Sequence, residues 1–162
     1  MPYVSSPVTP GVHETPFRYS SSRENFAYEV SLRTASSSPW LGELRAAHRL
    51  VQVLLRGELL GQYELLDFLI WPEGLLTRVS LRGSFSLSEF LSLLKEKSAP
   101  AGGAPGRFWD DELQWIKLVP PEKIPESTGA FLQTAGRIRQ GLPTAGGAAS
   151  PLFFFYRNSR LL

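Results

Sequence analysis

The stretch YELLDFLIWPEGLLTRVSLRG, residues 63–83, contains two apolar runs that are separated by the tripeptide PEG. Short runs rich in Val, Ile, Leu, Phe and Trp favour extended backbone when Pro and Gly bound them. The stretch therefore predicts two strands, over residues 62–71 and 75–82. Because the connection between them is so short, the two strands are expected to be antiparallel neighbours in one sheet.

The segments before this hairpin predict a strand and a helix. Residues 25–33, NFAYEVSLR, alternate apolar and polar side chains, which is typical of a strand that is buried on one face. After a Ser-rich turn, the apolar side chains of residues 40–60 recur at helical spacing. Gly57 is expected to end this helix, because glycine adopts the left-handed conformation of a C-terminal cap without strain.

The segment after the hairpin carries a helix start signal. Ser86 and Glu89 have the spacing of a capping box, in which each side chain accepts a hydrogen bond from the backbone N–H of the other residue. Phe85 and Phe90 have the spacing of a hydrophobic staple around that start. A helix is therefore expected over residues 87–97.

The remainder of the chain predicts a strand, a helix and a last short strand. Residues 113–119, LQWIKLV, have strand character and end at a Pro-Pro pair. Residues 126–140 carry apolar side chains at helical spacing, although Gly129 and Gly136 lower the helix propensity. The run LFFFYR, residues 152–157, could form a final strand.

The order of these elements predicts the fold class. Strand, helix, strand, strand, helix and strand in succession indicate an α+β fold of the ferredoxin-like βαββαβ kind. We expect an antiparallel sheet with helices on one face and an extra C-terminal helix. Residues 1–23 are expected to form a poorly ordered arm, residues 24–141 the domain, and residues 142–162 a linker with a strand-like segment.

The composition is that of a soluble globular chain. With 162 residues and 43% hydrophobic residues, the chain can bury one core. Its net charge of +2 does not demonstrate a broad field that attracts nucleic acid. The absence of Cys excludes disulfides and thiolate metal sites. The run LLDFLIW is too short to span a bilayer, and the first residues lack the apolar core of a targeting peptide. These features predict a cytoplasmic protein with no membrane partner.

Several segments in this order resemble the REP-associated transposases, the HUH single-tyrosine family. The segment YEVSLRT resembles the first strand of that family, GQYELLDFLIWPEGLLTRVSL its central hairpin, SLSEFLSLLKEKSA the following helix, and GRFWDDEL the loop before its last strand. The resemblance covers residues 26–140. In that family the hairpin carries a Pro, an Asn or Asp, and then two His residues on either side of an apolar residue.

The resemblance implies an active site that has lost its functional groups. Two imidazoles at positions i and i+2 share one face of a strand and hold a divalent cation, but the matching positions here are Gly74 and Leu76. The nucleophilic Tyr of the family lies on the helix after the last strand. In this chain the corresponding helix, residues 126–140, contains no Tyr, and Phe131 is its only aromatic residue. No metal or cofactor is therefore expected, and Tyr156 is the one late tyrosine that could have replaced the nucleophile.

Basic and aromatic residues of the second half provide candidate DNA contacts. Cationic side chains bind phosphates, and an aromatic ring can stack on an unpaired base. The candidates for contact with single-stranded or hairpin DNA are Lys117, Lys123, Arg137, Arg139 and Trp109. Solvated helix positions and core packing are the structural alternatives for these residues.

Three other features have a functional and a structural interpretation. Glu73 could be a remnant metal ligand, and His48 could be a base, although both residue types are common at solvated surface positions. The run of residues 110–112, Asp-Asp-Glu, could bind a cation, but a solvated acidic loop is the more common origin of such a run.

Two functions from different classes remain open at this point. The first is a catalytically inactive transposase-like protein that binds single-stranded or hairpin DNA. The second is a ferredoxin-like interaction or self-association module with no nucleic-acid role. The resemblance also implies a homodimer, because members of the family commonly pair. The RNA-recognition module does not fit, since the strand LTRVSLRG lacks the aromatic pattern that stacks on bases.

Overall fold

The computed structural model describes residues 26–98, 108–141 and 154–158. Its strands are β1 (Ala27–Arg33), β2 (Tyr63–Trp71), β3 (Gly74–Leu81), β4 (Trp115–Val119) and β5 (Phe154–Arg157). They form a five-stranded sheet in the order β4-β1-β3-β2-β5, in which all neighbours are antiparallel. The α-helices of this part of the chain are α1 (Leu44–Leu59), α2 (Leu87–Ser98) and α4 (Ile124–Gly141). The predicted α+β class and antiparallel sheet are confirmed.

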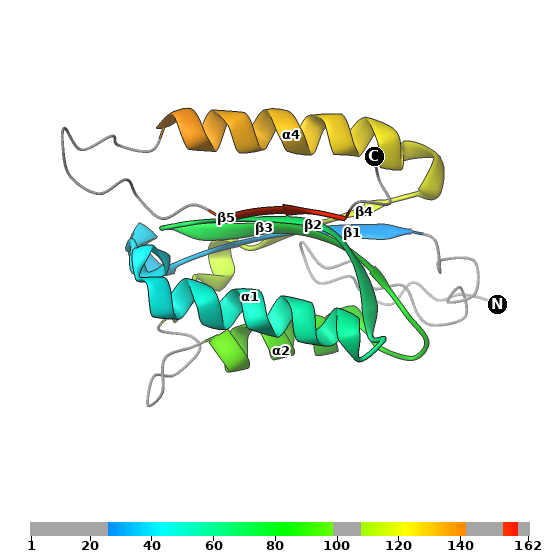
Figure 1. Ribbon diagram of the computed structural model, residues 1–162, viewed down its shortest axis with the longest axis horizontal. Coiled ribbons are helices and arrows are strands. Elements are labelled where there is room, and N and C mark those ends of the chain that lie inside the picture. Colours follow the sequence, from blue (N-terminus) through cyan, green and yellow to red (C-terminus); the bar gives the residue numbers. More distant parts are fainter. Residues whose placement is uncertain (1–25, 99–107, 142–153, 159–162) are drawn as a thin grey trace.

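The sheet is covered on both faces (Figure 1). Helices α1 and α2 lie side by side on one face, and α4 crosses the other. Strand β1 shows how the sequence supports this arrangement. Its residues Tyr28, Val30 and Leu32 belong to the core beneath α1 and α2, whereas Ala27 packs on the opposite face with Ile124 at the start of α4. The strand is therefore buried on both faces, and not on one as the alternation predicted.

The β2–β3 hairpin has the predicted tight turn. Trp71 pairs with Gly74, so Pro72 and Glu73 alone connect the strands. The carbonyl oxygen of Glu73 accepts a hydrogen bond from the Thr34 N–H at 3.0 Å, and that of Pro72 accepts one from the Leu41 N–H at 2.9 Å. The segment between β1 and α1 thus fixes the position of the turn.

Strand β2 contains an irregularity that its sequence did not predict. Leu65 pairs with Val79 and Asp67 pairs with Arg78, so Leu66 is an extra residue in the ladder. Such a bulge reverses the faces to which the following side chains point. Leu65 belongs to the core beneath α1 and α2, while Leu66 packs on the α4 face and Asp67 points toward the same helix.

Gly57 lies inside α1 and does not end it, so that prediction is wrong. The helix continues to Leu59, and Gly61, with φ of 77°, takes the left-handed conformation beyond it. A Cβ on Gly57 would lie 2.2 Å from the hydroxyl oxygen of Tyr63. Because that hydroxyl donates to the Leu54 carbonyl at 2.7 Å and the ring is buried, Gly57 is needed for close packing.

We expect Gly57→Ala to lower the free energy of unfolding by about 1–3 kcal/mol, because the new methyl group overpacks against a fixed ring. Gly136→Ala is the matched control in α4. A Cβ there meets nothing within 4 Å, so the better helix propensity of Ala should stabilise the protein by up to about 1 kcal/mol. Urea unfolding of both variants measures the difference. Shifts of the same sign would contradict the packing role of Gly57.

The capping box before α2 is confirmed. The Ser86 N–H donates to Glu89 Oε1 and the Glu89 N–H donates to Ser86 Oγ, both at 3.1 Å. The predicted staple residues, Phe85 and Phe90, both pack their rings against Tyr63, with centroid distances of 6.0 and 5.0 Å.

The later elements follow the predicted order with altered limits. Strand β4 begins at Trp115, since Leu113 ends a 3₁₀ turn over Asp111–Leu113. Strand β5 pairs with β2, so the strand-like segment predicted after the linker belongs to the same sheet as the domain. The predicted arm of residues 1–23 lies outside the described residues. None of the helices described is both long and apolar enough to cross a membrane.

Candidate functional site

A row of charged residues crosses all five strands on the face that α4 covers. The strand register sets Lys117 of β4 opposite Glu29 of β1, and Glu29 opposite Arg78 of β3. It also sets Arg78 opposite Asp67 of β2, and Asp67 opposite Arg157 of β5. The charges therefore alternate in sign across the sheet. Opposite charges at such cross-strand positions stabilise the pairing of the strands.

The centre of this row is a buried, bidentate ion pair. Arg78 donates from Nε to Asp67 Oδ1 at 2.8 Å and from Nη2 to Asp67 Oδ2 at 2.6 Å. Both side chains are fully buried, while Arg157 approaches Asp67 Oδ2 with its Nη2 at 3.2 Å. The bulge at Leu66 is what turns Asp67 onto this face. The paired geometry satisfies charges that burial would otherwise penalise strongly.

The same arginine ties α4 to the sheet. Arg78 Nη1 donates to Ser127 Oγ at 2.6 Å, and Nη2 donates to Thr128 Oγ1 at 2.8 Å. Both hydroxyls donate in turn to the Ile124 carbonyl, at 3.0 and 2.9 Å. The guanidinium also lies 5.4 Å from the centre of the Phe131 ring. The first two turns of α4 are therefore fixed over the charged row.

The carboxyl of Glu29 in this row has a raised pKa. Burial raises the pKa of Glu29 above its ordinary value of 4.5, and the neighbouring charges of Arg78 and Lys117 lower it by less. The folded state therefore holds this proton more tightly than the unfolded chain does. Ionised Glu29 opposes folding, and its cost appears as the pH rises from the ordinary pKa through the raised one.

We expect Glu29→Gln to gain stability relative to the unmodified protein as the pH is raised from 4 to 7, because Gln imitates the protonated carboxyl at every pH. Urea unfolding at both pH values measures the difference. Glu96→Gln, at an exposed position of α2, is the control and should give a smaller change with pH. If the Glu29→Gln variant instead loses stability relative to the unmodified protein as the pH rises to 7, attraction to Arg78 and Lys117 outweighs the cost of burial.

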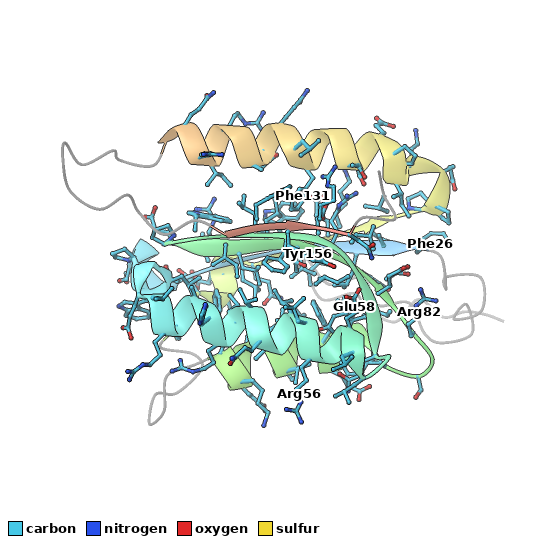
Figure 2. The ribbon with its side chains drawn as sticks, in the orientation of Figure 1. Phe26, Arg56, Glu58, Arg82, Phe131 and Tyr156 are labelled. Carbon is cyan, nitrogen blue, oxygen red and sulfur yellow. The ribbon has the colours of Figure 1, made fainter. Side chains whose placement is uncertain are left out.

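Two of the three positions that the resemblance matches to catalytic residues of the family lie together in an apolar cluster. Leu76 of β3 and Phe131 of α4 belong to the same buried set, which we call the α4 cluster. Its members are Leu69, Trp71, Leu76, Phe131 and Ala135. Figure 2 shows Phe131 between α4 and the sheet. The cluster contains hydrocarbon and aromatic rings, so it offers neither a metal ligand nor a nucleophile.

Gly74 is closely surrounded at the start of β3. A Cβ on this residue would lie 2.7 Å from Trp71 Cζ2 and 2.8 Å from the backbone oxygen of Leu32. The backbone oxygen belongs to the neighbouring strand and cannot move independently of the sheet. This position therefore has no space for any side chain.

Tyr156 lies on the other face of the sheet from these positions. It pairs with Phe68 of β2 and stacks on its ring at 5.2 Å with an interplanar angle of 14°. Phe68 belongs to the core beneath α1 and α2, whereas Leu76 and Phe131 lie beneath α4. The ring of Tyr156 is thus separated by the sheet from Leu76 and Phe131.

The candidate DNA contacts are spread over the molecule. Lys117 lies on β4 and Lys123 in the 3₁₀ turn before α4, while Arg137 and Arg139 lie in the last turns of that helix. Arg137 comes thirteen positions after Ile124 along this helix, which corresponds to about 20 Å. Arg137 donates to Thr134 and Lys123 pairs with Glu126. The four cations therefore do not form one cluster.

The two tryptophans near β4 have different environments. Trp109 is 2% exposed, and its Nε1 donates to Ser98 Oγ at 3.1 Å. Its ring is a core ring and is not available to stack on a base. Trp115, by contrast, is 43% exposed, so its ring is the one of the two that solvent can reach.

The acidic run of residues 110–112 has structural roles. Asp110 Oδ1 accepts a hydrogen bond from the Glu112 N–H at 3.0 Å, which caps the 3₁₀ turn. Asp111 pairs with Lys95 of α2 at 2.6 Å. Within residues 26–98, 108–141 and 154–158, no group of three or more His, Cys, Asp or Glu side chains could hold a metal ion. His48 and Glu73 belong to no such group.

Sequence reasoning missed the charged row, although two residues carried a signal for it. Asp67 interrupts the apolar run of β2, and Arg78 interrupts that of β3. A charged residue inside a buried strand normally has a partner of opposite charge. Pairing these two residues in advance required the bulge, which shifts the register by one position.

Comparisons of the sequence with protein-family models and with curated proteins found no match.

Proposed function

We propose that this chain is a transposase-like protein that binds single-stranded or hairpin DNA without cleaving it. The succession of β1, α1, β2, β3, α2 and β4 supports a ferredoxin-like classification, to which α4 and β5 add a helix and an edge strand. The sequence resemblance to REP-associated transposases supplies the functional class.

The observation that supports the loss of cleavage is the state of the face beneath α4. Cleavage in the family needs a cation held by two imidazoles and a tyrosine hydroxyl that attacks the phosphodiester. Leu76 and Phe131 contribute to a packed apolar cluster, and Gly74 has no space for a side chain. Arg78 fixes α4 above this face through Ser127 and Thr128. These contacts support a site that lacks the metal ligands and the nucleophile of the family and that α4 covers.

We expect no strand cleavage and no covalent adduct when the protein is incubated with labelled single-stranded or hairpin DNA and Mg²⁺ or Mn²⁺. Denaturing gels measure both products. The Tyr156→Phe variant is the control for a relocated nucleophile. An adduct that this variant abolishes would overturn the proposal and transfer the chemistry to β5.

Introducing histidines at positions 74 and 76 tests whether the covered site could accept the metal ligands of the family. Leu76→His alone places one imidazole in the α4 cluster, and Gly74→His also displaces the backbone of Leu32. We expect the double variant to unfold at lower urea concentration and to remain inactive. Cleavage by that variant would contradict the closed geometry.

A second function, self-association without a nucleic-acid role, is favoured by apolar residues at the end of α1. Leu59 is 86% exposed, and Leu55 and Leu60 lie exposed beside it. Exposed leucines in one place are typical of surfaces that pair. We propose a homodimer on this basis and on the family resemblance. Light scattering at micromolar concentration tests it: a monomer for the unmodified chain would remove the homodimer.

A further inference from the structure

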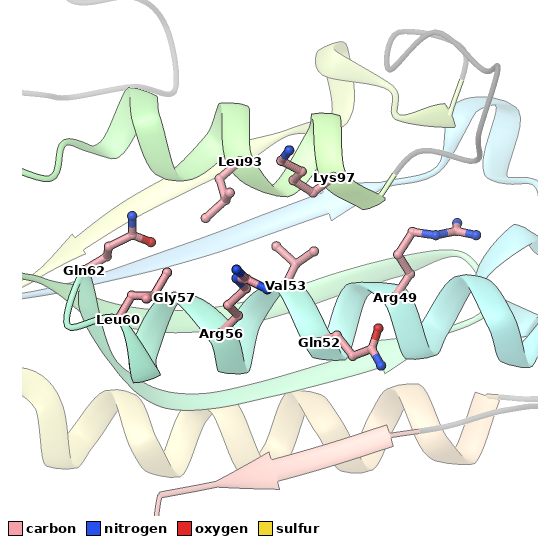
Figure 3. Close-up of a pocket in the computed structure, with 9 residues that line it drawn as sticks. All are labelled: Arg49, Gln52, Val53, Arg56, Gly57, Leu60, Gln62, Leu93 and Lys97. Carbon is pink, nitrogen blue, oxygen red and sulfur yellow. The ribbon is translucent and has the colours of Figure 1, made fainter.

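A groove between α1 and α2 collects basic side chains on the face opposite α4 (Figure 3). Its volume is about 520 Å³. The cations come from both helices, with Arg49 and Arg56 on α1 and Lys97 on α2. The other lining residues are uncharged: Gln52, Val53, Gly57, Leu60, Gln62 and Leu93. The described lining therefore contains no carboxylate to neutralise the cations.

The cations of this groove have few protein partners. Arg56 and Lys97 are exposed, and the side chain of neither makes a hydrogen bond or an ion pair with another described residue. Arg49 donates to the Ser98 carbonyl at 3.4 Å, at the end of α2. The nearby carboxylate of Glu58 accepts a hydrogen bond from the Leu65 N–H at 2.8 Å. In Figure 2, Arg56 extends away from the sheet, whereas Glu58 lies beside it.

Three arginines and a glutamine of α1 form a line along the helix axis. At about 100° per residue, Arg45, Arg49, Gln52 and Arg56 fall within about 60° of the helix circumference. The line from Arg45 to Arg56 is about 16 Å long at the helical rise. A second, more open hollow of about 770 Å³ shares Arg49 and Gln52 with the groove and continues it to Arg45 and Glu43. The basic surface is thus elongated along the helix.

We infer that this α1–α2 groove binds the phosphodiester backbone of a DNA strand. A line of separated guanidinium groups matches successive phosphates of a chain, whereas a single small anion would need cations that converge on one point. Gln52 and Gln62 add hydrogen-bond donors, and Val53, Leu60 and Leu93 give the groove an apolar side against which a sugar or base can lie. The inference rests on the proposed DNA-binding function and assigns that function to a different surface from the cations of α4.

The test compares two double variants that remove the same charge from opposite faces. Arg56→Gln with Lys97→Gln changes exposed residues of the groove, and Arg137→Gln with Arg139→Gln changes exposed residues of α4. Circular dichroism checks that both fold. Fluorescence anisotropy with labelled oligothymidine and with a labelled hairpin is recorded over a range of salt concentrations.

The groove variant should bind oligothymidine about 20-fold more weakly at 0.1 M salt, with the slope of log K against log salt reduced by about 1.4, because two phosphate contacts are lost. The α4 variant should stay within about twofold of the unmodified chain. Loss of affinity in the α4 variant alone would overturn the inference that DNA binds in the groove, whereas the proposed DNA-binding function would stand. No binding by the unmodified chain would overturn the proposed DNA binding, and the groove inference with it.

Discussion

Replacing Arg78 by Met is expected to lower the free energy of unfolding by about 3–5 kcal/mol, the usual cost of breaking a buried ion pair from one side. The change leaves the carboxylate of Asp67 inside the protein, with Arg157 as its remaining charged partner at 3.2 Å. It also removes the donors that hold Ser127 and Thr128 at the start of α4. A buried carboxylate that has lost its two shortest hydrogen bonds accounts for most of the expected loss.

Two further variants separate this explanation from a general effect of removing a charge. Arg82→Met breaks an ion pair with Glu64 in which the arginine side chain is 47% exposed, and it should cost less than about 1 kcal/mol. Combining Asp67→Leu with Arg78→Met should recover much of the loss, because an apolar pair carries no desolvation cost. Urea unfolding measures all three. Equal losses for Arg78→Met and Arg82→Met would contradict the buried pair's role.

Replacing Trp109 by Ala is expected to cost about 3–5 kcal/mol, since it removes a large buried ring and leaves a cavity. The ring packs edge-on against Phe108 with a centroid distance of 4.9 Å. The loss of its Nε1–H would also leave Ser98 Oγ without the bond that joins this loop to α2.

Trp115→Ala is the matched control, because Trp115 begins β4 and its ring is 43% exposed. We expect it to change the stability by less than about 1 kcal/mol. DNA affinity is measured in parallel with Trp109→Phe, which keeps most of the ring volume and should bind as the unmodified chain does. A selective loss of DNA binding in Trp109→Phe would show that this ring contacts DNA despite its burial.

The parts of the fold that could be predicted are those specified by neighbouring residues. The hairpin between β2 and β3 depends on a Pro-Glu-Gly turn between apolar runs, and the start of α2 depends on Ser86 and Glu89. Both signals span a few residues and involve backbone groups close in the chain. Gly57 shows the limit of such reasoning: its role is set by Tyr63, which reaches it only after α1 and β2 have packed.

The candidate site was predictable in part for the same reason. The resemblance drew attention to Leu76 and Phe131, which the structure brings into one cluster from β3 and α4. The pairing of Asp67 with Arg78 depends on a bulge, which is a property of two strands together. The alignment of Arg49, Arg56 and Lys97 around one groove required the packing of α1 against α2. Periodicity within one segment contains no information on such pairings.

The pairing of β5 with β2 has a consequence for how the sheet meets other chains. An unpaired strand edge is a template for addition of a strand from another molecule, and long apolar edges are the most prone to it. Strand β2 has nine residues and a largely apolar sequence, whereas the outermost strands, β4 and β5, have five and four. Residues 154–157 therefore cover the edge of β2 and prevent it from pairing with a strand of another molecule. A chain shortened to residue 141 would expose β2 and should tend to aggregate through edge-to-edge contacts.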